Sequence, residues 1–126
     1  MSERRFTLEE ANAALPELTA ALERIRDARQ VVFEHGERVR EGSRGNGGGA
    51  ESAESLEASR VLKREVERLA EEGIILREPE SGLVDFPAER DGRVIYLCWR
   101  LGEPEVGHWH DPDTGFAGRQ PLGPPG

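Results

Sequence analysis

The fold of this chain is decided in its second half, where the sequence reads Val94-Ile95-Tyr96-Leu97-Cys98-Trp99. Apolar side chains occupy both alternating sets of positions, which is typical of a central strand covered on both faces. Shorter apolar runs precede it at residues 74–76 and 83–86, and Asp91-Gly92 is a typical hairpin turn. These patterns predict a small, mostly antiparallel sheet of three or four strands over residues 74–110.

The first half of the chain carries a helical pattern instead. Apolar positions spaced three and four residues apart predict a helix over residues 7–41, which Thr7 and Glu10 begin as a capping box. Pro16 removes one backbone donor near the second turn, so we expect a kink or a break there. A second helical pattern covers residues 51–73 and ends at a glycine, a typical C-terminal cap.

The order of these segments predicts how the chain is organised. Residues 42–50 are rich in glycine and predict a flexible loop between the two helices, which would then form an antiparallel hairpin. Residues 111–126 are rich in turn-forming residues and predict an irregular tail. A chain of 126 residues is close to the usual size of one domain. We therefore expect a single α+β domain over residues 1–126, in which a long antiparallel helical hairpin is followed by the sheet.

The composition of the chain limits the partners that it can bind. The sequence has 25 acidic and 17 basic residues and a net charge of -8, so we expect no nucleic-acid partner. No apolar run approaches the roughly 20 residues of a membrane helix, and the first residues carry no signal-peptide block. We therefore expect no membrane partner and a cytoplasmic location. The single cysteine, Cys98, lies in an apolar run, which favours a reduced, packed thiol.

The predicted helical hairpin covers too little apolar surface to be stable by itself. Its first helix carries an apolar stripe formed by Leu15, Leu18, Leu22 and Ile25. We therefore expect a homo-oligomer, most simply a dimer, that forms through this stripe, or a protein partner that docks on the same hairpin.

A candidate metal site lies at the end of the predicted sheet. His108 and His110 stand two residues apart on a predicted strand, so both imidazoles would point to the same face and could bind one divalent metal ion. Asp113 follows within reach in the sequence as a possible carboxylate ligand. The alternative is that His108 faces solvent and that His110 forms hydrogen bonds within a turn.

A second group of polar residues could hold a small anionic ligand: Arg119, Asp85, Glu103 and Arg100. The guanidinium of Arg119 can bind the carboxylate of a ligand, and Arg100 would need a partner if it were buried. Asp85 lies between apolar residues of a predicted strand, where partial desolvation would perturb its carboxyl group. The alternative is an internal ion pair of Arg119 with Glu103 or Asp85.

Several stretches of the chain resemble a known family. They are Phe6-Thr7-Leu8-Glu9-Glu10-Ala11-Asn12, Gly82-Leu83-Val84-Asp85-Phe86-Pro87-Ala88, Tyr96-Leu97-Cys98-Trp99-Arg100-Leu101-Gly102-Glu103, Trp109-His110 and Gly115-Phe116-Ala117-Gly118-Arg119-Gln120-Pro121. Together they resemble the bacterial family named domain of unknown function 2203. The resemblance covers the two helices loosely and residues 82–122 closely. It implies a fold and a location for any site, but no activity.

Three classes of function fit these observations. The segment after the helices gathers histidine, arginine and carboxylate side chains, which favours a binding module that holds a divalent metal or a small anion on the C-terminal sheet. One alternative is a non-catalytic scaffold whose helical hairpin docks a protein partner. The other is a metal-dependent, hydrolase-like enzyme in which Asp85 or Glu103 acts as the base.

Overall fold

The computed structural model describes residues 4–42 and 52–122. Nearly all of the predicted glycine-rich loop and the end of the predicted tail lie outside these residues. Within them the elements follow in this order: α1 (Leu8–Ala13), α2 (Leu15–Glu41), α3 (Ala53–Glu72), β1 (Ile75–Glu78), β2 (Leu83–Arg90), β3 (Arg93–Arg100), β4 (His108–His110), a short 3-10 turn (Phe116–Gly118) and β5 (Gln120–Pro121). The helices precede the strands, so the fold is α+β.

The predicted helix over residues 7–41 is divided in two at Ala14, so the break expected near Pro16 is present. The capping box that begins α1 is present: the Glu10 amide donates to Thr7 Oγ1 at 3.0 Å, and the Thr7 amide donates to Glu10 Oε1 at 2.8 Å. A new helix, α2, then starts at Leu15 and places Pro16 in its first turn. The division falls just before Pro16 because a first-turn residue has no intrahelical partner for its amide.

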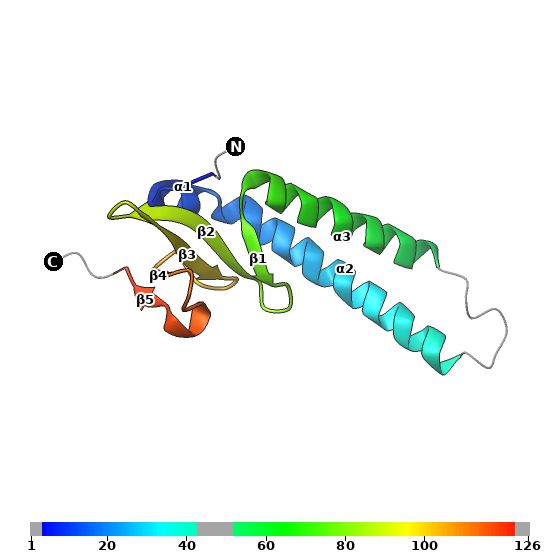
Figure 1. Ribbon diagram of the computed structural model, residues 1–126. Coiled ribbons are helices and arrows are strands. Elements are labelled where there is room, and N and C mark those ends of the chain that lie inside the picture. The colour runs from blue at the N-terminus through cyan, green and yellow to red at the C-terminus, as the bar shows by residue number, and fades with distance from the viewer. Residues whose placement is uncertain (1–3, 43–51, 123–126) are drawn as a thin grey trace.

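The two long helices, α2 and α3, lie side by side and run in opposite directions (Figure 1). Ser52 caps the start of α3 through a hydrogen bond from the Ser55 amide, and Gly73 ends it in the left-handed conformation. Between the helices, Arg24 binds the carboxylate of Glu65 with two hydrogen bonds of 3.1 Å. This contact pairs the charge of Glu65, which is almost fully buried.

The sheet contains five antiparallel strands within the described residues, in the order β1-β2-β3-β4-β5. The expectation of three or four strands is therefore wrong. The additional strand is β5, which lies in the segment predicted to be an irregular tail. A strand of two residues is too short to show an alternating pattern in the sequence, and its second residue is Pro121. It forms because the turn after β4 returns the chain to the edge of β4.

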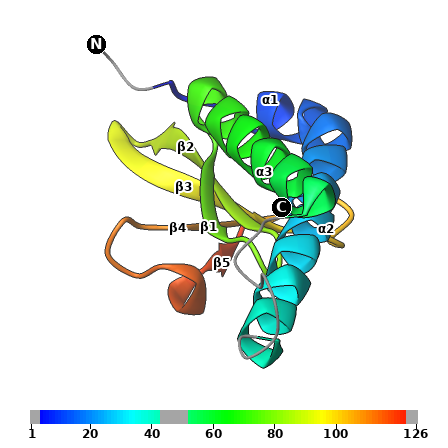
Figure 2. The same ribbon diagram turned by 90° about the vertical axis from the view of Figure 1, so that its right-hand side faces the viewer.

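The two faces of the sheet differ in character. One face packs on the helices and supplies most of the core, in which Val84, Phe86 and Trp99 meet Leu22 and Ile25. The segment that follows β4 lies on the side of the sheet away from α1 and α3 (Figure 2). The side chains on this second face include Asp85, Cys98 and His110, because residues opposite one another in the register share a face.

The apolar stripe of the first helical segment packs inside the chain. Leu18, Leu22 and Ile25 are at most 2% exposed and belong to the core, and Leu15 is packed against it. Because this stripe is buried, it offers no exposed surface for the expected dimer. Among the described residues, no helix combines the length and the apolar character needed to cross a bilayer.

Candidate functional site

Three neighbouring strands bring a carboxylate, a thiol and an imidazole together on the second face of the sheet. Asp85 of β2 is directly opposite Cys98 of β3, and His110 of β4 is opposite Tyr96, two residues from Cys98. Each of the three side chains offers a ligand atom, and these atoms lie within 4.8 Å of one another. All three residues are at most 3% exposed. The Asp85–Cys98–His110 triad is thus a buried group of three different donor atoms.

His110 is held at both ring nitrogens. Nδ1 lies 2.8 Å from the backbone carbonyl oxygen of Asp111, and Nε2 lies 2.9 Å from Asp85 Oδ2. A carbonyl oxygen only accepts hydrogen bonds, so Nδ1 carries the proton and donates it. This bond fixes the orientation of the ring and directs Nε2 toward Asp85 and Cys98. The Asp85 carboxylate also only accepts, so Nε2 donates in that contact and must release its proton before it can bind a metal ion.

Asp85 is the charged centre of the triad. Its Oδ2 accepts a hydrogen bond from Arg77 Nε at 2.7 Å in addition to the contact with His110. Its other oxygen, Oδ1, is buried and has no hydrogen-bond partner among the described residues. A buried carboxylate oxygen without a partner is unusual, because the lost hydration is not replaced.

The environment of Cys98 keeps its thiol protonated. Burial, followed by the negative charge of Asp85, raises the pKa of Cys98 to about 11. Arg119 opposes this rise because its Nη1 lies 4.0 Å from the sulfur. Near neutral pH the group is therefore a thiol, and a metal ion must displace its proton in order to bind the sulfur.

Arg119 is engaged by a carboxylate of the chain itself. Its Nη2 donates to Glu103 Oε2 at 2.8 Å and its Nη1 lies 3.4 Å from Oε1, which also accepts the Arg100 amide at 2.8 Å. Partial burial by itself would raise the pKa of Glu103, but the hydrogen bonds from Arg119 and the Arg100 amide outweigh it and lower that pKa. This arrangement is the internal ion pair that the sequence left open as an alternative.

The remaining residues singled out in the sequence lie around the triad. His108 is opposite Cys98 on β4, and its Nδ1 is buried without a hydrogen-bond partner among the described residues. Arg100 places its guanidinium 4.5 Å from the ring centre of Phe116. Asp113 is exposed on the turn after β4. The structure therefore joins His110 to Asp85 and Cys98, whereas His108 and Asp113 lie outside this group.

Two residues at this site, Cys98 and Arg77, were not among the candidate site residues predicted from the sequence. Cys98 was interpreted as a packed thiol because apolar residues flank it, and only the register shows that it faces Asp85. Arg77 lies on the edge strand β1, eight residues before Asp85, and no local pattern relates the two. A periodicity of two places Cys98 on the same strand face as Tyr96 and Arg100, which is the one signal that could have indicated a polar face.

The sequence profile of a family described as "Uncharacterized conserved protein (DUF2203)" matches residues 4–122. The chain belongs to this family. The match extends over α1 to β5 and includes every residue of the triad. No curated protein and no solved structure matches the chain.

In this DUF2203 protein a hollow of about 400 Å³ opens beside the triad. Asp85 and His110 form part of its wall, together with Leu83, Phe116 and the turn from Pro112 to Gly115. The charged groups of the wall are the carboxylates of Asp85, Glu78 and Asp113 and the guanidinium of Arg77. Carboxylates outnumber guanidinium groups, so the hollow favours cations over anions.

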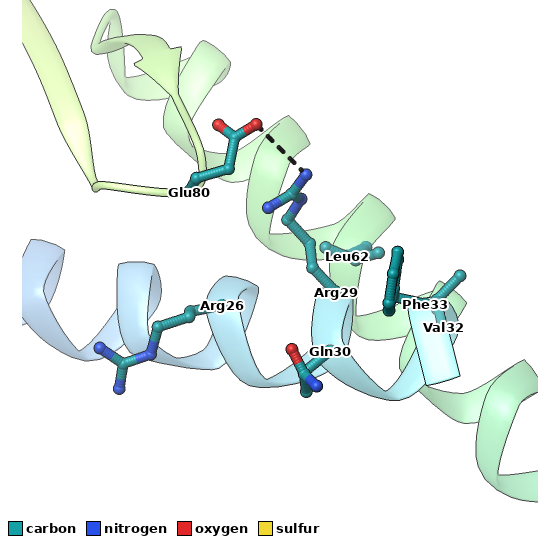
Figure 3. Close-up of a pocket in the computed structure, with 7 residues that line it drawn as sticks. All are labelled: Arg26, Arg29, Gln30, Val32, Phe33, Leu62 and Glu80. Atoms are coloured by element: carbon teal, nitrogen blue, oxygen red, sulfur yellow. Dashed lines mark ion pairs between the residues drawn. The ribbon is translucent and has the colours of Figure 1, made fainter. Parts of the chain in front are cut away.

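A larger hollow of about 620 Å³ lies between α2, α3 and the turn after β1 (Figure 3). Arg29 reaches across it to Glu80, with 3.7 Å between Nη2 and Oε2. Phe33 lies at its far end and is 61% exposed. The described residues of its wall include no histidine or cysteine, so this part of the structure offers a surface for contact and no cluster of metal ligands.

Proposed function

We propose that this chain is a binding module that holds a divalent metal ion at Asp85, Cys98 and His110. The observation that carries the proposal is the convergence of three ligand atoms, buried and within 4.8 Å of one another, from three adjacent strands. Strand positions hold side chains more rigidly than loops do, which is what a metal site requires.

The donor set favours zinc among the divalent metals. Imidazole nitrogen, thiolate sulfur and carboxylate oxygen are all common zinc ligands, whereas magnesium and calcium prefer oxygen alone. Zinc takes four ligands in a tetrahedral arrangement, so three protein ligands leave one position for water or for a bound molecule. Asp85 and His110 line the hollow, which gives that fourth position access from solvent.

The groups around the triad also support a metal. The backbone carbonyl of Asp111 orients His110 through Nδ1, as the partners of metal-bound histidines commonly do. The unpartnered Oδ1 of Asp85 is an acceptor that an ion would satisfy. The carboxylates of Glu78 and Asp113 would raise the local concentration of cations at the entrance.

A small anion is supported less well than a metal. Arg119 is already paired with Glu103, and Arg77 is paired with Asp85. An anion in the hollow would also have to approach three carboxylates, which costs electrostatic energy.

Binding of Zn²⁺ to the purified protein tests the proposal. We expect one ion per chain, measured by equilibrium dialysis and elemental analysis, and at least hundredfold weaker affinity in Asp85→Asn, Cys98→Ser and His110→Gln. Co²⁺ in place of Zn²⁺ should give the near-ultraviolet sulfur-to-cobalt absorption of a thiolate ligand, and Cys98→Ser should abolish it.

His108→Gln and Glu105→Gln are the matched controls, because His108 borders the triad without belonging to it and Glu105 is an exposed carboxylate outside the hollow. We expect both to keep the Zn²⁺ affinity of the natural chain within about threefold. Far-ultraviolet circular dichroism of every variant checks that it folds. Equal affinity in the natural chain and in Cys98→Ser, or no binding by a folded natural chain, would contradict the metal site.

The proposal places the protein in a reducing compartment. A cysteine that binds metal must remain a thiol or a thiolate, and the cytoplasm maintains that state. This agrees with the cytoplasmic location expected from the sequence.

Self-association through the helices is the second candidate function. Phe33 is 61% exposed near the end of α2, beside a hollow whose rim carries Arg26, Arg29 and Glu80. An exposed aromatic side chain between charges of both signs suits contact with a second copy of the chain. Sedimentation equilibrium of the natural chain and of Phe33→Ser tests it: a dimer that the substitution dissociates would support it, and a monomer at all concentrations would contradict it.

A further inference from the structure

Arg77 pairs with Asp85, the carboxylate that a metal ion at the triad would need as a ligand. Its Nε lies 2.7 Å from Asp85 Oδ2, and its guanidinium carbon lies 5.2 Å from the ring centre of Tyr96. The side chain of Arg77 is 43% exposed, whereas that of Asp85 is 2% exposed. One member of this ion pair is therefore fixed inside the protein and the other can move into solvent.

The backbone around Arg77 differs from that of a regular strand. Arg77 lies on β1, an edge strand of four residues, and the pairing of β1 with β2 shifts between Leu76 and Glu78. Such an irregularity leaves the intervening residue outside the regular ladder. The long side chain of Arg77 thus reaches Asp85 from the rim of the hollow, not from a packed position in the sheet.

A guanidinium and a divalent ion cannot both contact the carboxylate of Asp85 without strong repulsion. Two positive charges a few ångströms apart repel each other more strongly in surroundings less polar than water. A buried carboxylate with no cation beside it is also unfavourable. Asp85 therefore needs a positively charged partner, and a divalent ion on either of its oxygens would take over that role from Arg77.

We propose that Arg77 is the built-in competitor of the metal ion for Asp85, so that the ion and the Arg77 guanidinium exchange at this carboxylate. This inference rests on the proposed metal site and adds how that site is regulated. When the ion binds, Arg77 leaves Asp85 and moves into the hollow or the solvent. When the ion leaves, Arg77 returns and pairs the buried charge.

The exchange determines what kind of metal site this is. A structural zinc site is needed for folding because nothing else holds its ligands together. Here Arg77 holds Asp85, the Asp111 carbonyl holds His110, and Arg119 lies near Cys98, so these partners can hold the ligands while the ion is exchanged. The site is therefore suited to reversible binding of an available ion, as in a sensor or a carrier.

Titration of Zn²⁺ into Arg77→Gln tests the exchange. Glutamine keeps a polar side chain on β1 but removes the competing charge, so we expect about ten- to a hundredfold tighter binding than in the natural chain. Arg77→Lys keeps the charge and should bind within about threefold of the natural chain. Arg90→Gln is the matched control, because Arg90 carries the same charge on the same sheet but lies over Trp109, 4.6 Å from its ring centre.

A second measurement follows Arg77 directly. The Nε–H resonance of Arg77, assigned by its disappearance in Arg77→Gln, should shift in the ¹H–¹⁵N spectrum of the natural chain when Zn²⁺ is added. The inference is overturned if Arg77→Gln binds no tighter than the natural chain, if Arg90→Gln tightens binding equally, or if the resonance does not move on saturation.

The outcomes separate this inference from the metal site itself. Zn²⁺ binding by the natural chain with unchanged affinity in Arg77→Gln would remove the exchange and leave the site. Absence of binding in both chains would remove both proposals. Binding by Arg77→Gln alone would support the competition and would show that the natural chain does not hold zinc.

Discussion

Asp85 shows most clearly how single residues shape this protein. Its carboxylate is almost completely buried, yet Arg77 and His110 both bind its Oδ2. A buried charge is tolerated only when it is paired and hydrogen-bonded. The same pairing makes Asp85 sensitive to its neighbours, because loss of either partner removes one of the two contacts of its Oδ2.

Glu103 provides a test at the scale of one residue. Its pKa is lowered from the ordinary value of 4.5, so its ionised form is favoured in the folded chain. The stabilisation that follows is fully present above the pKa of the unfolded chain, and it is lost as the pH falls through the lower folded value. We expect Glu103→Gln to lower the free energy of unfolding by about 1–2 kcal/mol near pH 7 and by progressively less below about pH 4.5, measured by urea denaturation.

Glu105→Gln is the control for this prediction. Glu105 is exposed two residues away, so the substitution removes the same charge without removing the contacts with Arg119 and the Arg100 amide. A constant difference between Glu103→Gln and Glu105→Gln from pH 7 to pH 3 would contradict the ion pair as the cause.

At the scale of the elements, the strand turns position the polar face. The turn after β1 ends at Gly82, whose carbonyl accepts the Leu101 amide at 3.0 Å and whose φ is 73°. Asp85 follows three residues later on β2. The backbone at Gly82 therefore fixes both the start of β2 and its approach to the end of β3.

We predict that Gly82→Ala destabilises the fold by about 2–4 kcal/mol. A left-handed φ costs a residue with a side chain roughly 1 kcal/mol. In addition, a Cβ at this position would lie 2.6 Å from the Cβ of Leu101, and the sheet would have to shift. Thermal and urea unfolding measure the loss.

Gly92→Ala separates the cost of the left-handed backbone from the cost of the contact with Leu101. Gly92 has a φ of 78° in the turn between β2 and β3, but a Cβ there would meet no atom of the described residues within 4 Å. We therefore expect a loss of only about 1 kcal/mol. Equal losses in the two variants would show that the contact with Leu101 has no role.

At the scale of the whole molecule, helices and sheet share one core. Leu18 and Leu22 of α2 and Leu69 of α3 pack with Phe86 and Trp99 of the sheet. The amide of Val106, before β4, also donates to Asn12 Oδ1 of α1 at 2.8 Å. Because these contacts join the two halves of the chain, we propose that it unfolds as the single domain expected from the sequence.

Two spectroscopic signals test this proposal. The two tryptophans of the chain, Trp99 and Trp109, both lie in the sheet, whereas far-ultraviolet circular dichroism is dominated by the helices. We expect tryptophan fluorescence and circular dichroism to give the same urea midpoint and the same free energy of unfolding. Midpoints that differ would show that the helices and the sheet unfold separately.

Parts of the fold and of the candidate site could be predicted from local patterns. The α+β order followed from a change of apolar period between residues 73 and 83, and the Thr7–Glu10 capping box was readable as a motif. Asp85 was recognisable as a carboxylate between apolar residues of a strand, and His110 was recognisable through its spacing of two from His108. A break near Pro16 was expected from its missing backbone donor, whereas the two-residue strand β5 was not recognisable, because a very short strand leaves no periodic signal.

The sequence by itself therefore determined the order of helices and strands and the presence of histidine, arginine and carboxylate groups in the last third of the chain. Only the tertiary structure decided that His110, and not His108, meets Asp85 and Cys98, that Arg77 joins them, and that the Leu18–Ile25 stripe is buried within the chain. The physical reason is the separation along the chain between the residues that interact. Periodicity arises from the geometry of consecutive residues, whereas strand register and burial arise from contacts between residues far apart in the chain.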